Sequence, residues 1–164
     1  MRTNLTQKFS KDAAKGRSGN GARHTKLQRE DRKMHKAVAT RTGHFEHLVK
    51  VRDHRLVTDE PADLGGGDAG PSPLELLAAS LASCTATTIE MYAARKEWDI
   101  GEVKVRVEYE TAKRGSPTRF AITLCLPENL DEEQVRRLNE IAAKCPVHRT
   151  LDGEVMFDET VVRQ

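Results

Sequence analysis

Hydrophobic and polar residues alternate along two segments in the second half of the chain. Residues 103–109 place Val or Tyr at every second position, and residues 120–126 place Phe, Ile or Leu there. A period of two predicts strands with one buried face. The connecting segment, Lys113–Pro117, has a glycine at its centre and predicts an antiparallel hairpin. Weaker patterns predict further strands over 44–51, 55–58 and 154–162.

Two segments instead carry helix signals. Ser72, Pro73 and Glu75 form a capping box with proline in the first turn, which predicts a helix running to about Lys96. Its first half is nearly all apolar or small, as in a central, buried helix. A second, amphipathic helix is predicted over 131–144, and Pro146 prevents its smooth continuation. The order β-β-α-β-β-α-β predicts an α+β fold with antiparallel sheet.

Basic residues are concentrated at the N-terminus. Residues 1–36 hold eleven Lys and Arg against three acidic residues, whereas the whole chain of 164 residues has a net charge of only +2. These 36 residues lack a hydrophobic period, so we expect a mobile basic extension (1–36) followed by one folded domain (37–164). Such an extension could contact nucleic acid through counterion release, but a solvated tail is the simpler interpretation, and we expect no nucleic-acid partner.

The sequence also limits the cellular setting. No apolar run approaches the roughly 20 residues of a membrane helix, and the N-terminus has no apolar signal-peptide stretch. Three cysteines are too few for a secreted disulfide scaffold. We therefore expect a cytoplasmic protein without a membrane partner, in which a cysteine pair is catalytic, redox-active or metal-binding.

Cys84 and Cys145 are the main candidates for chemistry. Cys84 lies twelve residues beyond Ser72, too far for the helix terminus to activate its thiol. Cys145 precedes Pro146 at a helix end, where the irregular backbone can reorient its sulfur. That position suits a resolving thiol, which attacks a sulfenic acid on Cys84 and forms a disulfide. An inert core cysteine remains an alternative for Cys84, and Cys125 is interpreted as structural.

Other chemistry stays open. Cys145 and His148 have the spacing of half a zinc site, to which Cys84 and one of the histidines 44, 47 or 54 could contribute. A Cys84–His148 pair for acyl transfer is conceivable, but nothing resembles a nucleophile elbow.

The glycines at 65–67 could cradle an anion, although a flexible loop is the simpler interpretation. Glu75 has a sufficient role in the capping box and lies about 13 Å along the helix from Cys84, on its opposite face.

The segment Pro73-Leu74-Glu75-Leu76-Leu77-Ala78-Ala79 leading to Cys84, together with Cys145-Pro146, resembles the OsmC/Ohr family of thiol-dependent hydroperoxide reductases. The resemblance covers roughly residues 44–162 and is stronger to the broader OsmC-like branch. It implies an intertwined homodimer in which antiparallel sheets wrap around two central helices. It further implies Cys84 as peroxidatic thiol, Cys145 as resolving thiol, no permanently bound cofactor or metal, and reduction by an external dithiol of lipoyl type.

Two features depart from the family pattern. The functional glutamate of the hydroperoxide-resistance branch directly follows the proline, where this chain has Leu74, and the glutamate is displaced to Glu75. The arginine from the N-terminal strands that holds the cysteine as thiolate in the family has no clear match. Arg41, Arg52 and Arg55 lie in the corresponding region, and Arg149 is a further candidate because it follows Cys145. We expect an organic hydroperoxide peroxidase of the peroxiredoxin type that acts in oxidative stress defence. The alternative is a non-enzymatic OsmC-like dimer that binds a small apolar ligand.

Overall fold

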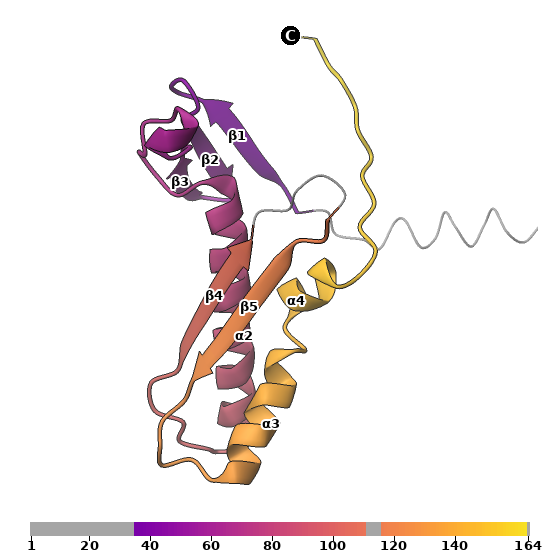
Figure 1. The fold of residues 1–164 in the computed structure, drawn as a ribbon. Helices are drawn as coiled ribbons and strands as arrows, with labels where there is room; N and C mark the ends of the chain where they lie inside the picture. Colours follow the sequence, from indigo (N-terminus) through magenta and orange to yellow (C-terminus); the bar gives the residue numbers. More distant parts are fainter. Residues whose placement is uncertain (1–34, 111–115, 164) are drawn as a thin grey trace, which may run out of the picture. The chain divides into compact units, whose positions relative to one another are not determined.

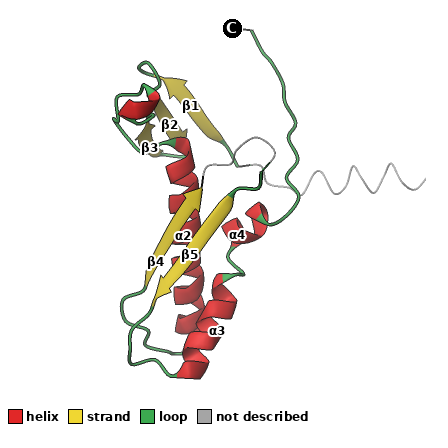
Figure 2. Cartoon of the chain, in the orientation of Figure 1, coloured by secondary structure: helices red, strands yellow, loops and turns green. Residues whose placement is uncertain are grey.

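The computed structural model describes residues 35–110 and 116–163. Figures 1 and 2 show the elements, which are β1 (Ala37–Arg41), β2 (His47–Val51), β3 (His54–Thr58), the 3₁₀ turn η1 (Ala62–Leu64), α2 (Pro73–Arg95), β4 (Lys104–Glu110), β5 (Arg119–Cys125), α3 (Glu132–Ala142) and α4 (Pro146–Leu151). β1, β2 and β3 form one small sheet, and β4 and β5 form a second. The predicted α+β class is confirmed.

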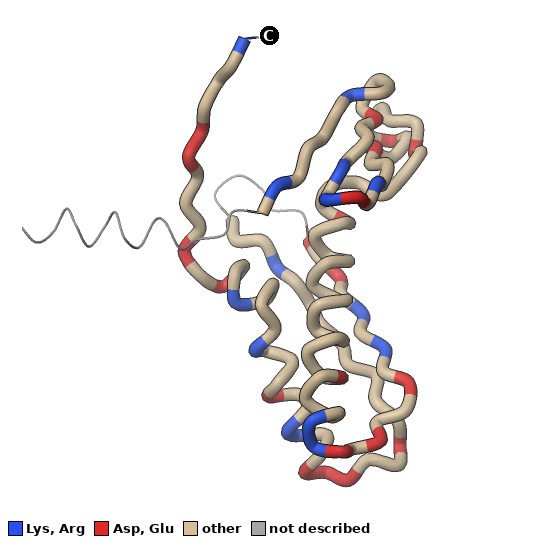
Figure 3. The backbone as a smooth tube through the Cα atoms, turned by 180° about the vertical axis from the view of Figure 1, so that it is seen from behind, with Lys and Arg blue, Asp and Glu red and all other residues tan. Residues whose placement is uncertain are grey.

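Helix α2 begins where the capping box predicts. The Ser72 hydroxyl accepts the Glu75 backbone N–H at 3.4 Å, and a Glu75 carboxylate oxygen accepts the Ser72 backbone N–H at 2.7 Å. Both bonds satisfy backbone groups that a bare helix end leaves unpaired. Few charged residues interrupt the helix (Figure 3), but within the single chain only one stripe of it is buried, whereas the sequence predicted a buried helix.

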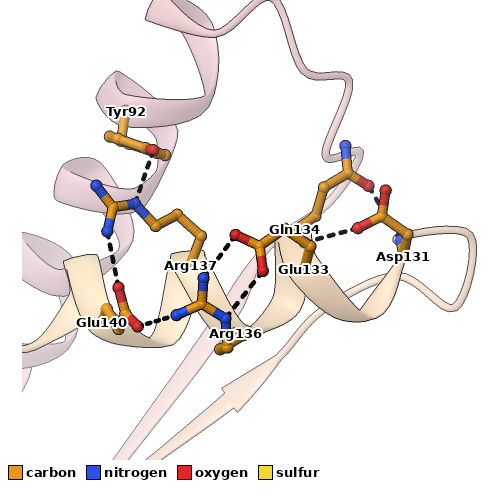
Figure 4. Close-up of polar contacts among 7 residues, drawn as sticks. All are labelled: Tyr92, Asp131, Glu133, Gln134, Arg136, Arg137 and Glu140. Carbon is orange, nitrogen blue, oxygen red and sulfur yellow. Dashed lines mark hydrogen bonds and ion pairs between the residues drawn. The ribbon is translucent and has the colours of Figure 1, made fainter.

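The main core lies between α2, α3 and the hairpin. Ile89 of α2 and Leu138 of α3 are both completely buried, and Leu124 of β5 packs against this cluster. The Arg137 guanidinium donates to the Tyr92 hydroxyl at 3.0 Å and also pairs with Glu140, so one polar contact joins α3 to α2 at the edge of the core (Figure 4).

The predicted hairpin forms with the expected faces. β4 and β5 pair antiparallel, with Val107 opposite Ile122, and residues of β4 alternate between exposed and half-buried. β4 packs against α2, which buries the apolar side of the hairpin. Part of the connection, residues 111–115, lies outside the described residues.

The glycine-rich loop folds around a buried carboxylate. Asp59 is 3% exposed and accepts backbone N–H groups from Glu60, Gly67 and Ala69 at 2.9–3.2 Å. These bonds lower the pKa of Asp59, with the Ala69 bond the strongest cause. The Gly65 and Gly66 N–H groups donate to backbone carbonyls of η1 and Pro61, and the Gly67 N–H donates to Asp59, so all three N–H groups that could have cradled an external anion are already used. A Cβ on Gly66 would lie 1.8 Å from the Glu60 carbonyl oxygen, so the loop needs glycine there.

Three elements differ from the sequence prediction. β1 was not predicted, and its five residues are all exposed. α4 was not predicted, because Pro146 was interpreted as ending a helix, whereas it occupies the first position of a new one. The predicted strand over 154–162 is wrong: these residues form no strand and are exposed. A strand needs a neighbouring edge for its backbone groups, and the described chain offers none to this segment.

The structure does not test the prediction of a mobile basic extension. The basic extension falls almost entirely in residues 1–34, outside the part of the chain that the structure describes. Among the described residues, no helix combines the length and apolar character required to span a bilayer.

Candidate active site

Cys84 lies at mid-length on α2, on the side of the helix next to the buried stripe. The stripe consists of Leu81, Thr85 and Ile89 at spacings of four residues, all at most 2% exposed. Cys84 itself is half-buried and free. The Thr88 hydroxyl, one turn further along, donates to the Cys84 carbonyl at 2.7 Å. Cys84 is therefore only partly covered by the rest of the chain.

Cys145 lies at the N-terminal cap of α4 and is completely buried. Its extended backbone lets the chain turn from α3 into α4, and Pro146 sets the first helical residue. The Cys145 sulfur accepts the backbone N–H of His148 at 3.3 Å. Because α4 packs against α2, this cap brings the second sulfur to Cys84.

The two thiols influence each other, and their pKa values shift in opposite directions. Burial is the largest cause that raises the pKa of Cys84, and the bond and charge of Cys145 raise it further. Burial also opposes ionisation of Cys145. The His148 N–H, which donates to the Cys145 sulfur at 3.3 Å, is the largest of the causes that outweigh burial, so the pKa of Cys145 is lowered.

A groove of about 460 Å³ lies between α2, β5 and α4, and it is lined by neighbours of the two cysteines rather than by the cysteines themselves. Leu81, Phe120, Ile122 and Leu151 give it apolar walls, and Arg119, His148 and Asp152 add polar groups. Leu81 precedes Cys84 by three residues, nearly one helical turn, and His148 is the donor to Cys145. A small, mainly apolar molecule in this groove would lie close to the half-buried thiol.

The remaining predicted residues are not gathered at the sulfurs. Glu75 caps α2, and its bonds to Ser72 lower the pKa of the carboxyl. Arg55 on β3 and Arg149 on α4 are exposed. Within the described residues no hydrogen bond or ion pair links Glu75, Arg55 or Arg149 to either cysteine.

Four groups at the pair were missed by sequence reasoning. They are the hydroxyls of Thr85 and Thr88 and the backbone N–H groups of Val147 and His148. Thr85 left a signal in the sequence, since it is a polar residue in the repeating apolar stripe of α2. The backbone N–H groups left no signal in the sequence, because their positions depend on helix α4, which was not predicted. Within the described residues no three His, Cys, Asp or Glu side chains converge as a metal site would require.

Comparison with known proteins agrees with this architecture. Residues 65–160 match the family model described as OsmC-like protein. Among solved structures, a protein of Psychrobacter arcticus 273-4 named for osmotic stress and detoxification responses is 27% identical, with a TM-score of 0.65 over 73% of this chain and 89% of that one. Among curated protein sequences, none matches the chain.

Two further structures share the fold at lower identity. An organic hydroperoxide resistance protein OsmC of Legionella pneumophila is 21% identical, with a TM-score of 0.58 over 74% of this chain and 93% of that chain. The organic hydroperoxide resistance protein OhrB of Bacillus subtilis is 23% identical, with a TM-score of 0.53 over 74% and 92%. With more than half of its residues matched by the family model, and with this fold, the chain belongs to the OsmC/Ohr family of OsmC-like proteins.

Proposed function

We propose that this protein is a thiol-dependent peroxidase that reduces organic hydroperoxides in peroxide stress defence. The observation that carries the proposal is the pairing of a half-buried and a buried free thiol, Cys84 on α2 and Cys145 at the start of α4, which are close enough to influence each other's pKa. Membership of a family whose solved members include organic hydroperoxide resistance proteins supports it. A protein that only bound an apolar ligand in the groove would need no such pair.

The accessible sulfur performs the first step. The Cys84 thiolate attacks an oxygen of the hydroperoxide, the O–O bond breaks, and an alkoxide leaves and takes up a proton to become an alcohol. Cys84 is thereby oxidised to a sulfenic acid. The Cys145 sulfur then attacks Cys84, hydroxide leaves and is protonated to water, and a Cys84–Cys145 disulfide forms. The apolar walls of the groove favour an organic hydroperoxide over hydrogen peroxide.

The catalytic cycle closes with an external reductant. A dithiol, of lipoyl type as the family resemblance implies, exchanges with the disulfide and restores both thiols. We propose no permanently bound cofactor, and a reducing, cytoplasmic compartment in which the free cysteines persist. Glu75, Arg55 and Arg149 remain candidates for a role at the pair, and in a dimer a second chain could supply one of them.

We also propose a homodimer. Support comes from apolar side chains that the single chain leaves exposed in its last ten residues: Met156 is 80% and Phe157 81% exposed, and Val161 is 93% exposed. Such side chains in an extended segment suit pairing with a second copy, which would supply the missing strand edge. Sedimentation should give a dimer for the full chain and a monomer after deletion of residues 154–164. A monomeric full chain would contradict this assembly.

Steady-state consumption of cumene hydroperoxide with dihydrolipoamide as reductant tests the activity. Cys84→Ser should abolish turnover, and Cys125→Ser is the matched control, because Cys125 is a half-buried cysteine on β5 outside the pair. We expect the control to retain wild-type turnover. Equal consumption by wild type and Cys84→Ser, with both proteins folded, would refute the proposed function.

A further inference from the structure

His148 lines the groove with a side chain that neither the fold nor the thiol chemistry uses. It is the third residue of α4, is half-buried, and shares the groove wall with Leu81 and Phe120. Its backbone is engaged, because the N–H donates to the Cys145 sulfur and the carbonyl accepts the Asp152 N–H. Among the described residues, none hydrogen-bonds to its imidazole. An imidazole that the fold does not need points to a role toward a molecule in the groove.

The burial of one ring nitrogen decides which nitrogen carries the proton. Nδ1 of His148 is buried and has no partner among the described residues. A neutral imidazole has one N–H and one bare nitrogen, and buried N–H groups are left unpaired more rarely than buried acceptors. The bare nitrogen is therefore Nδ1, and the proton is on Nε2. Because Nδ1 is covered, Nε2 is the nitrogen that remains for the groove, and it offers a neutral N–H donor there.

The same residue lies beside the reacting sulfurs. A disulfide joins its two sulfurs at about 2 Å. Because the proposed reaction forms such a bond between Cys84 and Cys145, a residue whose backbone nitrogen is 3.3 Å from the Cys145 sulfur is also close to Cys84. Leu81 of the groove lies nearly one turn before Cys84 on α2. A hydroperoxide that reaches Cys84 from the groove therefore passes the His148 ring.

The other polar groups of the groove are less suited to donate to a reacting oxygen. Asp152 can only accept when it is ionised. Thr118 and Arg119 carry donors, but both residues are exposed, so water competes for them. His148 combines a donor with partial burial among apolar walls, where a hydrogen bond to a developing charge is worth most.

We propose that His148 is a catalytic residue whose Nε2–H donates a hydrogen bond to the oxygen that leaves when Cys84 attacks the hydroperoxide. The inference rests on the proposed peroxidase function and adds a residue to its first step. The Cys84 sulfur bonds to the outer oxygen, the O–O bond breaks, and the negative charge moves to the oxygen attached to carbon. His148 stabilises that charge and keeps its own proton, so the alkoxide takes a proton from water. The thiolate, the hydroperoxide and one water thus yield a sulfenic acid, an alcohol and one hydroxide.

Two peroxides with different leaving groups test the proposal. Cumene hydroperoxide releases a strongly basic tertiary alkoxide, which needs a donor, whereas perbenzoic acid is also aromatic but releases benzoate, which needs little help. The rate constant of single-turnover consumption is measured for both with fully reduced protein and no reductant. His148→Phe keeps the backbone N–H and fills the place of the ring. It should slow the reaction of cumene hydroperoxide by roughly a hundredfold and that of perbenzoic acid by less than about threefold.

His148→Gln is the rescue variant, because its amide N–H lies near the place of Nε2, and it should recover most of the rate with cumene hydroperoxide. His35→Phe is the matched control: it replaces an exposed histidine that does not line the groove, and both rates should stay unchanged. Equal slowing of both peroxides by His148→Phe would mean that the ring only shapes the groove and would overturn the proposal, as would two unchanged rates. A wild type that does not consume cumene hydroperoxide would refute the peroxidase function itself, and this role with it.

Discussion

Oxidation of the Cys84–Cys145 pair should stabilise the fold. A disulfide between these positions closes a loop of about 60 residues, and the loss of chain entropy in the unfolded state corresponds to about 4 kcal/mol at 25 °C. Oxidation also ends the polar interaction between the two reduced thiols, which subtracts about 1 kcal/mol. The expected net gain in the free energy of unfolding is therefore about 3 kcal/mol.

Urea unfolding of reduced and oxidised protein at one fixed concentration measures this gain. With a typical slope of about 2 kcal/mol per M for a small protein, the midpoint should rise by roughly 1.5 M after oxidation. Cys125→Ser should show the same rise, and Cys84→Ser should show none. An oxidised protein with a mapped Cys84–Cys145 disulfide and no gain in stability would contradict this view, because the bond would then require α2 and α4 to separate.

Three further predictions concern the elements around the site. Ser72→Ala removes the cap of α2 and should lower the free energy of unfolding by about 1 kcal/mol in urea titration. Gly66→Ala places a Cβ against the Glu60 carbonyl oxygen and should lower it by about 2 kcal/mol or more in the same assay. Asp59→Asn should lower the melting temperature at pH 7, and because the pKa of Asp59 is lower in the folded state, this difference should shrink as pH falls below about 4.

Each of these three predictions has a result that would contradict it. Ser72→Asp keeps a capping side chain and should match the wild type, so an equal loss in both variants would exclude the cap as the cause. A Gly66→Ala protein as stable as wild type would mean that the loop can move away from Glu60. A deficit of Asp59→Asn that stayed constant down to pH 3 would mean that the ionised carboxylate is not what holds the loop.

The sequence predicts those elements whose signals are local. Ser72 and Glu75, which are only three positions apart, define the start of α2, and the alternation of apolar and polar residues in β4 and β5 defines a hairpin without help from distant residues. The short helix α4 was not predicted, because a proline can either end one helix or occupy the first position of the next, and Pro146 occupies the first position.

The site depended on information that is not local. The candidate pair could be chosen because Cys84 and Cys145 each lie in a distinctive context, and the structure brings them together. The opposite pKa shifts of the two thiols could not be predicted, because the lowered pKa of Cys145 depends on a backbone N–H group of α4. The segment 154–162 has the alternation of a strand, but its pairing edge is not within the described chain, so the pattern alone gave the wrong result.

The most direct test of the proposed chemistry is a single turnover. One equivalent of cumene hydroperoxide is added to the fully reduced protein in the absence of reductant, and the disulfides are mapped by mass spectrometry of peptides. The paired-thiol mechanism predicts one Cys84–Cys145 disulfide per chain, the loss of two thiols, and Cys125 still reduced. Recovery of all three free thiols with the hydroperoxide unconsumed, or a disulfide that involves Cys125, would contradict it.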